Sequence, residues 1–117
     1  MRQSFAALAL ALLGASPAVA QTSPAEGNWA CTANIDSTKA GILTIFAGSY
    51  GYASANYGSA ASGTGNAQLA TDGVTFLDGN LVLNAGITTG LLSFDDQARD
   101  VLTLSTTEKP ILTCRPR

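Results

Sequence analysis

The two thiols of this chain, Cys31 and Cys114, are the residues whose chemistry is most informative. They stand near the two ends of the chain that remains once an export signal is removed, and an oxidising compartment favours their pairing. A redox-active pair would need a Cys-x-x-Cys spacing, a histidine or a helix start that lowers a thiol pKa, and the sequence offers none of these. We therefore predict one disulfide that joins the first and the last structured segments.

The side chains that usually carry catalysis are sparse. The chain contains no histidine, and Lys39 and Lys109 stand in turn-like contexts without a Ser-x-x-Lys motif that could activate a serine. Gly63-Thr64-Gly65 resembles the start of a dinucleotide-binding fingerprint, but the third glycine and the following helix are missing. We expect a protein that is not an enzyme and has no cofactor.

Three carboxylates, Asp95, Asp96 and Asp100, gather in one polar segment and could supply oxygen ligands to calcium. The spacing of a dedicated calcium loop is absent, so a solvated turn is the favoured interpretation. Structural zinc needs histidine or free thiols, and both thiols are better explained as a disulfide. No metal site is predicted.

Three tyrosines, Tyr50, Tyr52 and Tyr57, lie in an uncharged stretch, 48–65, that is rich in glycine, serine and alanine. The same composition is typical of binding loops, in which rigid aromatic rings supply contact area. Tyr50 and Tyr52 share a strand face, so packing is the alternative for these two. The sequence therefore predicts a binding loop built around the three rings, with its long mobile part over 55–65.

The N-terminus has the pattern of an export signal. A basic start at Arg2 precedes an apolar run over 5–13, and Ala18-Val19-Ala20 supplies a small-residue cleavage site. We expect a cleaved signal peptide over 1–20, a flexible segment over 21–26 and one domain over 27–117. The location would be periplasmic or secreted, without membrane insertion, because no segment reaches the length of a spanning helix. Six basic against eight acidic residues, a net charge of −2, argue against a nucleic-acid partner.

Short apolar runs broken by turn residues predict an all-β domain. Alternation places Trp29, Cys31 and Ile35 on one inward face. Asp78-Gly79 favours a type I′ hairpin between 74–77 and 80–83. The expected strands are 28–35, 41–47, 49–53, 66–70, 74–77, 80–84, 90–94, 101–105 and 110–115.

These eight or nine short strands have connections too brief for crossover helices, so an antiparallel meander is expected. Closure would remove exposed edges and bring Cys31 beside Cys114. The prediction is a small up-and-down β-barrel, with a two-sheet β-sandwich as the alternative. Eight strands enclose a space that side chains can fill, so a large interior cavity is not expected.

The start of the first strand, Gly27-Asn28-Trp29, resembles the Gly-x-Trp opening of lipocalin-like (calycin-type) barrels. The resemblance implies that Trp29 plugs one barrel end and that an arginine of the last strand, Arg115, lies across it. Size, export and strand number also resemble small bacterial periplasmic barrels that inhibit lysozyme or proteases, although no inhibitory motif is present. The overall arrangement is also similar to short exported bacterial proteins that carry no assigned function.

Three functions follow as hypotheses. The leading one is a non-catalytic exported binding module for a protein partner, such as a hydrolase that it inhibits, and we expect it to be a monomer. The alternatives are a carrier of a small apolar ligand inside the barrel and a structural envelope protein without a ligand.

Overall fold

The architecture is described from a computed structural model of the chain, over residues 24–56 and 58–117. The predicted signal peptide, 1–20, and Tyr57 lie outside the described residues, so these predictions stay predictions. The described part of the segment predicted as flexible, 24–26, packs onto the domain. Ala25 is fully buried there, and the Glu26 carboxylate accepts a hydrogen bond from the backbone N–H of Ala47 at 2.6 Å.

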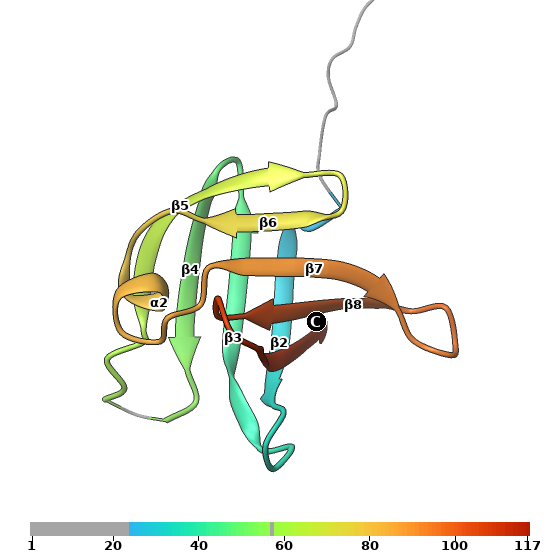
Figure 1. The fold of residues 1–117 in the computed structure, drawn as a ribbon, viewed down its shortest axis with the longest axis horizontal. Helices are drawn as coiled ribbons and strands as arrows, with labels where there is room; N and C mark the ends of the chain where they lie inside the picture. The colour runs from blue at the N-terminus through green and yellow to red at the C-terminus, as the bar shows by residue number, and fades with distance from the viewer. Residues whose placement is uncertain (1–23, 57) are drawn as a thin grey trace, which may run out of the picture.

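The described residues form an all-β meander with one helical turn (Figure 1). The strands are β2 (Gly27–Ala33), β3 (Lys39–Phe46), β4 (Ser49–Ser54), β5 (Gly63–Ala70), β6 (Gly73–Phe76), β7 (Thr89–Phe94), β8 (Asp100–Ser105) and β9 (Pro110–Pro116). The helix is α2 (Asn80–Leu83). Every strand pairs antiparallel with the next one along the chain.

The sheet closes on itself because β2 pairs with β9 as well as with β3. Closure confirms the barrel prediction over the two-sheet alternative. Cys31 and Cys114 are direct register partners across this seam and form the predicted disulfide, with an S–S distance of 2.04 Å. A covalent bond therefore fastens the one pair of strands that must meet for the barrel to close.

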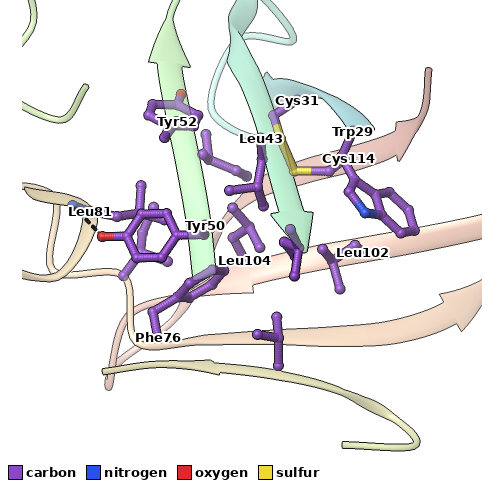
Figure 2. Packing of buried hydrophobic residues seen from close by; sticks show 14 of the residues in the cluster. Trp29, Cys31, Leu43, Tyr50, Tyr52, Phe76, Leu81, Leu102, Leu104 and Cys114 are labelled. Carbon is purple, nitrogen blue, oxygen red and sulfur yellow. Dashed lines mark hydrogen bonds between the residues drawn. A yellow bond between two sulfur atoms is a disulfide. The ribbon is translucent and has the colours of Figure 1, made fainter. Parts of the chain in front are cut away.

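The barrel interior is filled by inward-facing side chains, as the alternation of buried and exposed positions requires (Figure 2), with β7 contributing the partly buried Leu92. The buried strand residues are Trp29, Cys31, Leu43, Ile45, Tyr50, Tyr52, Ala67, Val74, Phe76, Leu102, Leu104, Leu112 and Cys114. Trp29 and Cys31 point inward together, as the alternation predicts, and each is 2% exposed.

The two ends of this core are closed differently. At one end the Trp29 indole N–H donates to the backbone carbonyl of Ala25 at 2.9 Å. At the other end α2 and the segment after it insert Leu81 and Ile87, which are 0% and 1% exposed. Figure 2 places Trp29 and Leu81 on opposite sides of the cluster.

The predicted hairpin over 74–83 is wrong. β6 pairs with β5 and β7, and the residues after Asp78-Gly79 form α2 instead of a strand. Gly79 has φ 87° and ψ −178°, whereas a type I′ turn needs ψ near zero. The helical turn is favoured because it buries Leu81 at the open barrel end, a long-range contact that the Asp-Gly pattern does not encode.

Two further expectations are corrected. Ile35 is 93% exposed, because β2 ends at Ala33 and the chain reverses through the next residues. β5 begins at Gly63, within the segment predicted as a loop over 55–65, and Gly65 is the register partner of Tyr50. A Cβ at Gly65 would lie 2.6 Å from the Tyr50 ring, so glycine there leaves room for the ring.

Candidate functional site

Tyr50 and Tyr52, which the sequence places in a binding loop, lie in the core of the barrel. Their side chains are 3% and 7% exposed, and burial raises the pKa of both hydroxyls. The Tyr50 hydroxyl donates to the carbonyl of Asp78 at 2.7 Å and accepts from the N–H of Leu81 at 3.2 Å. The Tyr52 hydroxyl donates to the carbonyl of Ala40 at 2.9 Å. The rings therefore hold the barrel together and present no surface to a partner.

The interior leaves little space for a ligand. Tyr50 and Phe76 pack edge to face with their ring centres 5.1 Å apart, and Figure 2 shows both rings near Leu81. The buried cluster contains no charged side chain that could bind a polar ligand group. The candidate site described next lies on the outer surface of the barrel.

The outer wall of β2, β3 and β4 carries the best candidate, a hollow of about 590 Å³ that we call the wall hollow. It is lined by Ala30, Cys31, Thr32, Lys39, Gly41, Ile42, Ala53, Ser54, Ala55 and Arg117. Its floor is a row of three outward-facing apolar residues in register, since Ala30 pairs with Ile42 and Ile42 pairs with Ala53. Small side chains on both sides of Ile42 leave the wall hollowed and apolar.

Two cations, Lys39 and Arg117, line the wall hollow. All ion pairs within residues 24–56 and 58–117 involve Asp95, so neither of these cations is neutralised by one. The acidic residue closest to Lys39 in the chain is Asp36. Its carboxylate accepts from the Thr38 hydroxyl at 2.7 Å and from the Thr38 N–H at 3.1 Å, which lowers the pKa of Asp36.

The strand register separates the two cations. Lys39 pairs with Thr32 on β2, and the backbone N–H of Arg117 donates to the carbonyl of Asn28 on the same strand at 3.0 Å. These two β2 residues are four positions apart, about 13 Å along the strand, and the two cations lie on opposite sides of β2. The two basic residues therefore line the wall hollow from strands on either side of β2.

Asp95 is one of the three carboxylates that could have bound calcium. Its carboxylate instead accepts hydrogen bonds and forms ion pairs within the same chain. Its carboxylate accepts from the N–H groups of Gln97 and Arg99 and forms ion pairs with the Arg99 Nε at 3.1 Å and the Arg115 Nη1 at 2.7 Å. The hydrogen bond from the Arg99 N–H is the largest of the effects that lower the pKa of Asp95 to about 2. No group of three or more potential metal ligands occurs in the described part of the chain.

Arg115, which the resemblance places across Trp29, lies on the outside of the barrel. It follows the buried Cys114 on β9, pairs in register with Ala30 and binds Asp95. Trp29 points inward and is bonded to Ala25. Arg115 thus forms an ion pair with Asp95, whereas the Trp29 indole is held by Ala25 at one end of the core.

The described part of the segment predicted as a mobile loop is fastened to α2. The Asn80 and Asn84 side-chain amides donate to the carbonyls of Ser62 and Ala60 at 2.8 and 3.0 Å. Ala55, the first residue of that segment, and Ser54, the last residue of β4, line the wall hollow. Within the predicted binding loop, Ser54 and Ala55 line the wall hollow, whereas Tyr50 and Tyr52 do not.

The wall hollow was not predicted from the sequence. A signal was available: Ala30, Ile42 and Ala53 occupy outward positions of strands whose inward positions are apolar too. What relates Arg117 to Lys39 is the register of β2 with β3 and β9, which only the closed barrel provides.

Within the described residues, no helix has the length and apolar character needed to cross a membrane. No protein-family model, curated protein or solved structure matches this chain.

Proposed function

We propose that this chain is an exported, non-catalytic module that binds a protein partner through the wall hollow. The observation that carries the proposal is an apolar floor lined by two cations that form no ion pair with the residues the structure describes, on the outside of a barrel whose interior is filled. The disulfide is consistent with an oxidising compartment outside the cytoplasm.

The shape of the wall hollow favours a protein over a small molecule. Small ligands bind in concave sites that cover most of their surface, whereas the wall hollow lies on the outer face of a sheet and is open on one side. A protein partner can cover the hollow and the surrounding strands together, with apolar contacts at the centre and polar contacts at the rim. Inhibition of a hydrolase is one form that such binding would take.

Affinity capture from the exported fraction of the producing cells tests this proposal. The wild-type protein, Ala53→Arg and Gln68→Arg serve as baits, since Ala53 lies on the floor of the wall hollow and Gln68 is an exposed residue of β5 away from it. We expect one set of proteins to be retained by wild type and Gln68→Arg and lost with Ala53→Arg. Equal capture by all three baits would contradict binding at the wall hollow.

The second hypothesis, a small apolar ligand inside the barrel, has less support because aromatic and aliphatic side chains occupy the interior. A native mass spectrum of the freshly purified protein tests it. The proposal expects the mass of the polypeptide alone, and a bound small molecule that remains after Ala53→Arg would favour the carrier hypothesis instead.

A further inference from the structure

We propose that the outer surface of β3, β4 and β5 binds a neutral polysaccharide, with one sugar ring stacked on the side chain of Phe46. The site is a hollow of about 340 Å³, which we call the Phe46 hollow. Its described lining residues come from these three strands and from the turn between β3 and β4, and none of them lines the wall hollow. The inference therefore goes beyond the proposed function and does not depend on it.

The exposure of Phe46 is the first argument. Phe46 is the last residue of β3 and is 72% exposed, although proteins bury most phenylalanine side chains. The electron-rich face of an aromatic ring attracts the weakly positive C–H groups of a sugar ring and removes them from water. Pyranoses with equatorial hydroxyl groups, such as glucose, present several C–H groups on one face. The exposed ring thus offers a stacking surface to a sugar of this kind.

The hydroxyl groups beside the ring are the second argument. Ser49 on β4 pairs in register with Phe46, and Thr64 on β5 pairs with Gly51, two positions after Ser49. Both side chains are exposed, and within residues 24–56 and 58–117 neither hydroxyl forms a hydrogen bond with another group of the chain. Each hydroxyl can donate one hydrogen bond and accept others. Together they offer donors and acceptors to the hydroxyl groups of a sugar that lies on Phe46.

The charge and the shape of the hollow are the third argument. Among the described residues that line the Phe46 hollow, none is charged. Gly51 leaves the centre open, because a Cβ added there would meet only the Thr64 Cγ2, at 3.8 Å. A ring face and hydroxyl groups around an uncharged depression match a neutral, hydroxyl-rich ligand. They offer no ion pair to an acidic or a basic one.

The turn that carries Phe46 is held in place by the chain itself. Ala47 and Gly48 have φ angles of 52° and 86°, which are typical of a two-residue hairpin turn. The Ala47 N–H donates to the Glu26 carboxylate at 2.6 Å, which ties the turn to the segment before β2. A fixed backbone at Phe46 reduces the conformational entropy that binding has to remove.

The position of the hollow favours a polymer over a single sugar. It lies on the outer face of the sheet and can cover only one face of a sugar unit, so a monosaccharide gains little from it. A polysaccharide presents the same unit repeatedly, which raises the local concentration of the unit at the site. An exported protein meets such polymers in the cell envelope or outside the cell.

A titration with cellotetraose, a soluble oligomer of β-linked glucose, tests the inference. Sorbitol, which has the hydroxyl groups without the ring, is the control at equal hydroxyl concentration. Binding to the complete oxidised domain is followed through backbone amide shifts in NMR spectra. We expect saturable shifts at Phe46, Ser49, Gly51 and Thr64, with affinity at least about fivefold higher for cellotetraose than for sorbitol, because only a sugar ring can stack. Added salt should leave this affinity unchanged, since no ion pair forms.

Three variants of the protein locate the binding. Phe46→Ala removes the stacking surface and should lower the affinity for cellotetraose at least about fivefold. Gly51→Val fills the open centre of the hollow and should weaken binding as well. Phe94→Ala removes another phenylalanine that is 72% exposed, at the end of β7, and should leave the affinity unchanged. A urea midpoint no lower than that of the wild type shows that each variant is folded.

Several results would overturn the inference. These are equal affinity for cellotetraose and sorbitol, shifts elsewhere on the barrel, no shifts with cellotetraose, or an affinity that survives both Phe46→Ala and Gly51→Val. Shifts at Phe46 with dodecanoate but not with cellotetraose would assign the surface to lipid and would overturn it too. The capture experiment with Ala53→Arg tests the wall hollow separately, because Ala53 does not line the Phe46 hollow.

Discussion

The two faces of the wall formed by β2, β3 and β4 have opposite characters. Inside, Leu43 and Ile45 are fully buried and pack among aromatic rings and the disulfide. Outside, Ile42 lies between two alanines in a hollow that Lys39 and Arg117 also line, and neither cation forms an ion pair with another residue of the described ranges. The inner face uses its side chains to fill the barrel, and we propose that binding takes place on the outer face. A barrel of this size is thus a solid support whose outer surface can carry function.

The largest expected change in stability comes from removing the Cys31–Cys114 disulfide, which joins β2 to β9. Cys31→Ser with Cys114→Ser should lower the free energy of unfolding by about 4.5 kcal/mol, because the bond closes a loop over almost all of the described chain. Urea unfolding of the variant and of the oxidised protein measures the difference. A change below about 1 kcal/mol would show that packing alone closes the barrel.

The two faces of β3 can be compared through adjacent residues. Leu43→Ala removes a fully buried side chain and should lower the free energy of unfolding by about 3 kcal/mol. Ile42→Ala, one position along the strand on the outer face, should cost less than about 1 kcal/mol, because its side chain is only partly buried. Comparable losses in urea unfolding would mean that the outer wall belongs to the stabilising core.

Removing the Tyr50 hydroxyl tests how much its hydrogen bonds stabilise the barrel end that α2 covers. Tyr50→Phe keeps the ring but removes the bonds to the Asp78 carbonyl and the Leu81 N–H. We expect a loss of about 1 to 2 kcal/mol and faster amide hydrogen exchange at Leu81. Tyr52→Phe, which removes a single bond, is the matched control and should leave exchange at Leu81 unchanged.

The smallest expected effect is the pH dependence that Asp95 contributes. Its pKa is lowered from 3.8 to about 2 in the folded state, so its contribution to stability is complete above about pH 4 and is lost as the pH falls toward 2. Urea midpoints at pH 4, 3 and 2 should decline less steeply for Asp95→Asn than for wild type. Parallel declines would indicate that Asp95 does not hold Arg99 and Arg115 in solution.

Most of the barrel could be predicted from the sequence, because two independent features of the sequence agree. The alternation of apolar and polar residues indicates which side of each strand faces inward. The pairing of Cys31 with Cys114 indicates that the first and last strands lie side by side. The prediction failed where a long-range contact outweighs a local pattern. Asp78-Gly79 has the composition of a hairpin turn, but the Tyr50 hydroxyl binds the chain on both sides of Gly79 and Leu81 fills the barrel end.

The candidate site was harder to predict for a related reason. The tyrosines have the composition of a binding loop, yet Gly41 and Gly65 leave space for the rings of Tyr52 and Tyr50 inside the barrel. Nothing local in the sequence shows that an aromatic ring has a glycine opposite to it on another strand. The wall hollow likewise depends on strand register, which places Arg117 and Lys39 on the same face.

The most direct test of the outer wall as the binding surface is site-specific photo-crosslinking in the producing cells. A photoreactive amino acid replaces Ala53 in one variant and Gln68 in the other, and mass spectrometry identifies the adducts. We expect a discrete protein adduct from position 53 and none from position 68. The adduct at position 53 should be lost when Lys39 and Arg117 are changed to Gln. Adducts of equal yield from both positions, or none from position 53, would contradict this expectation.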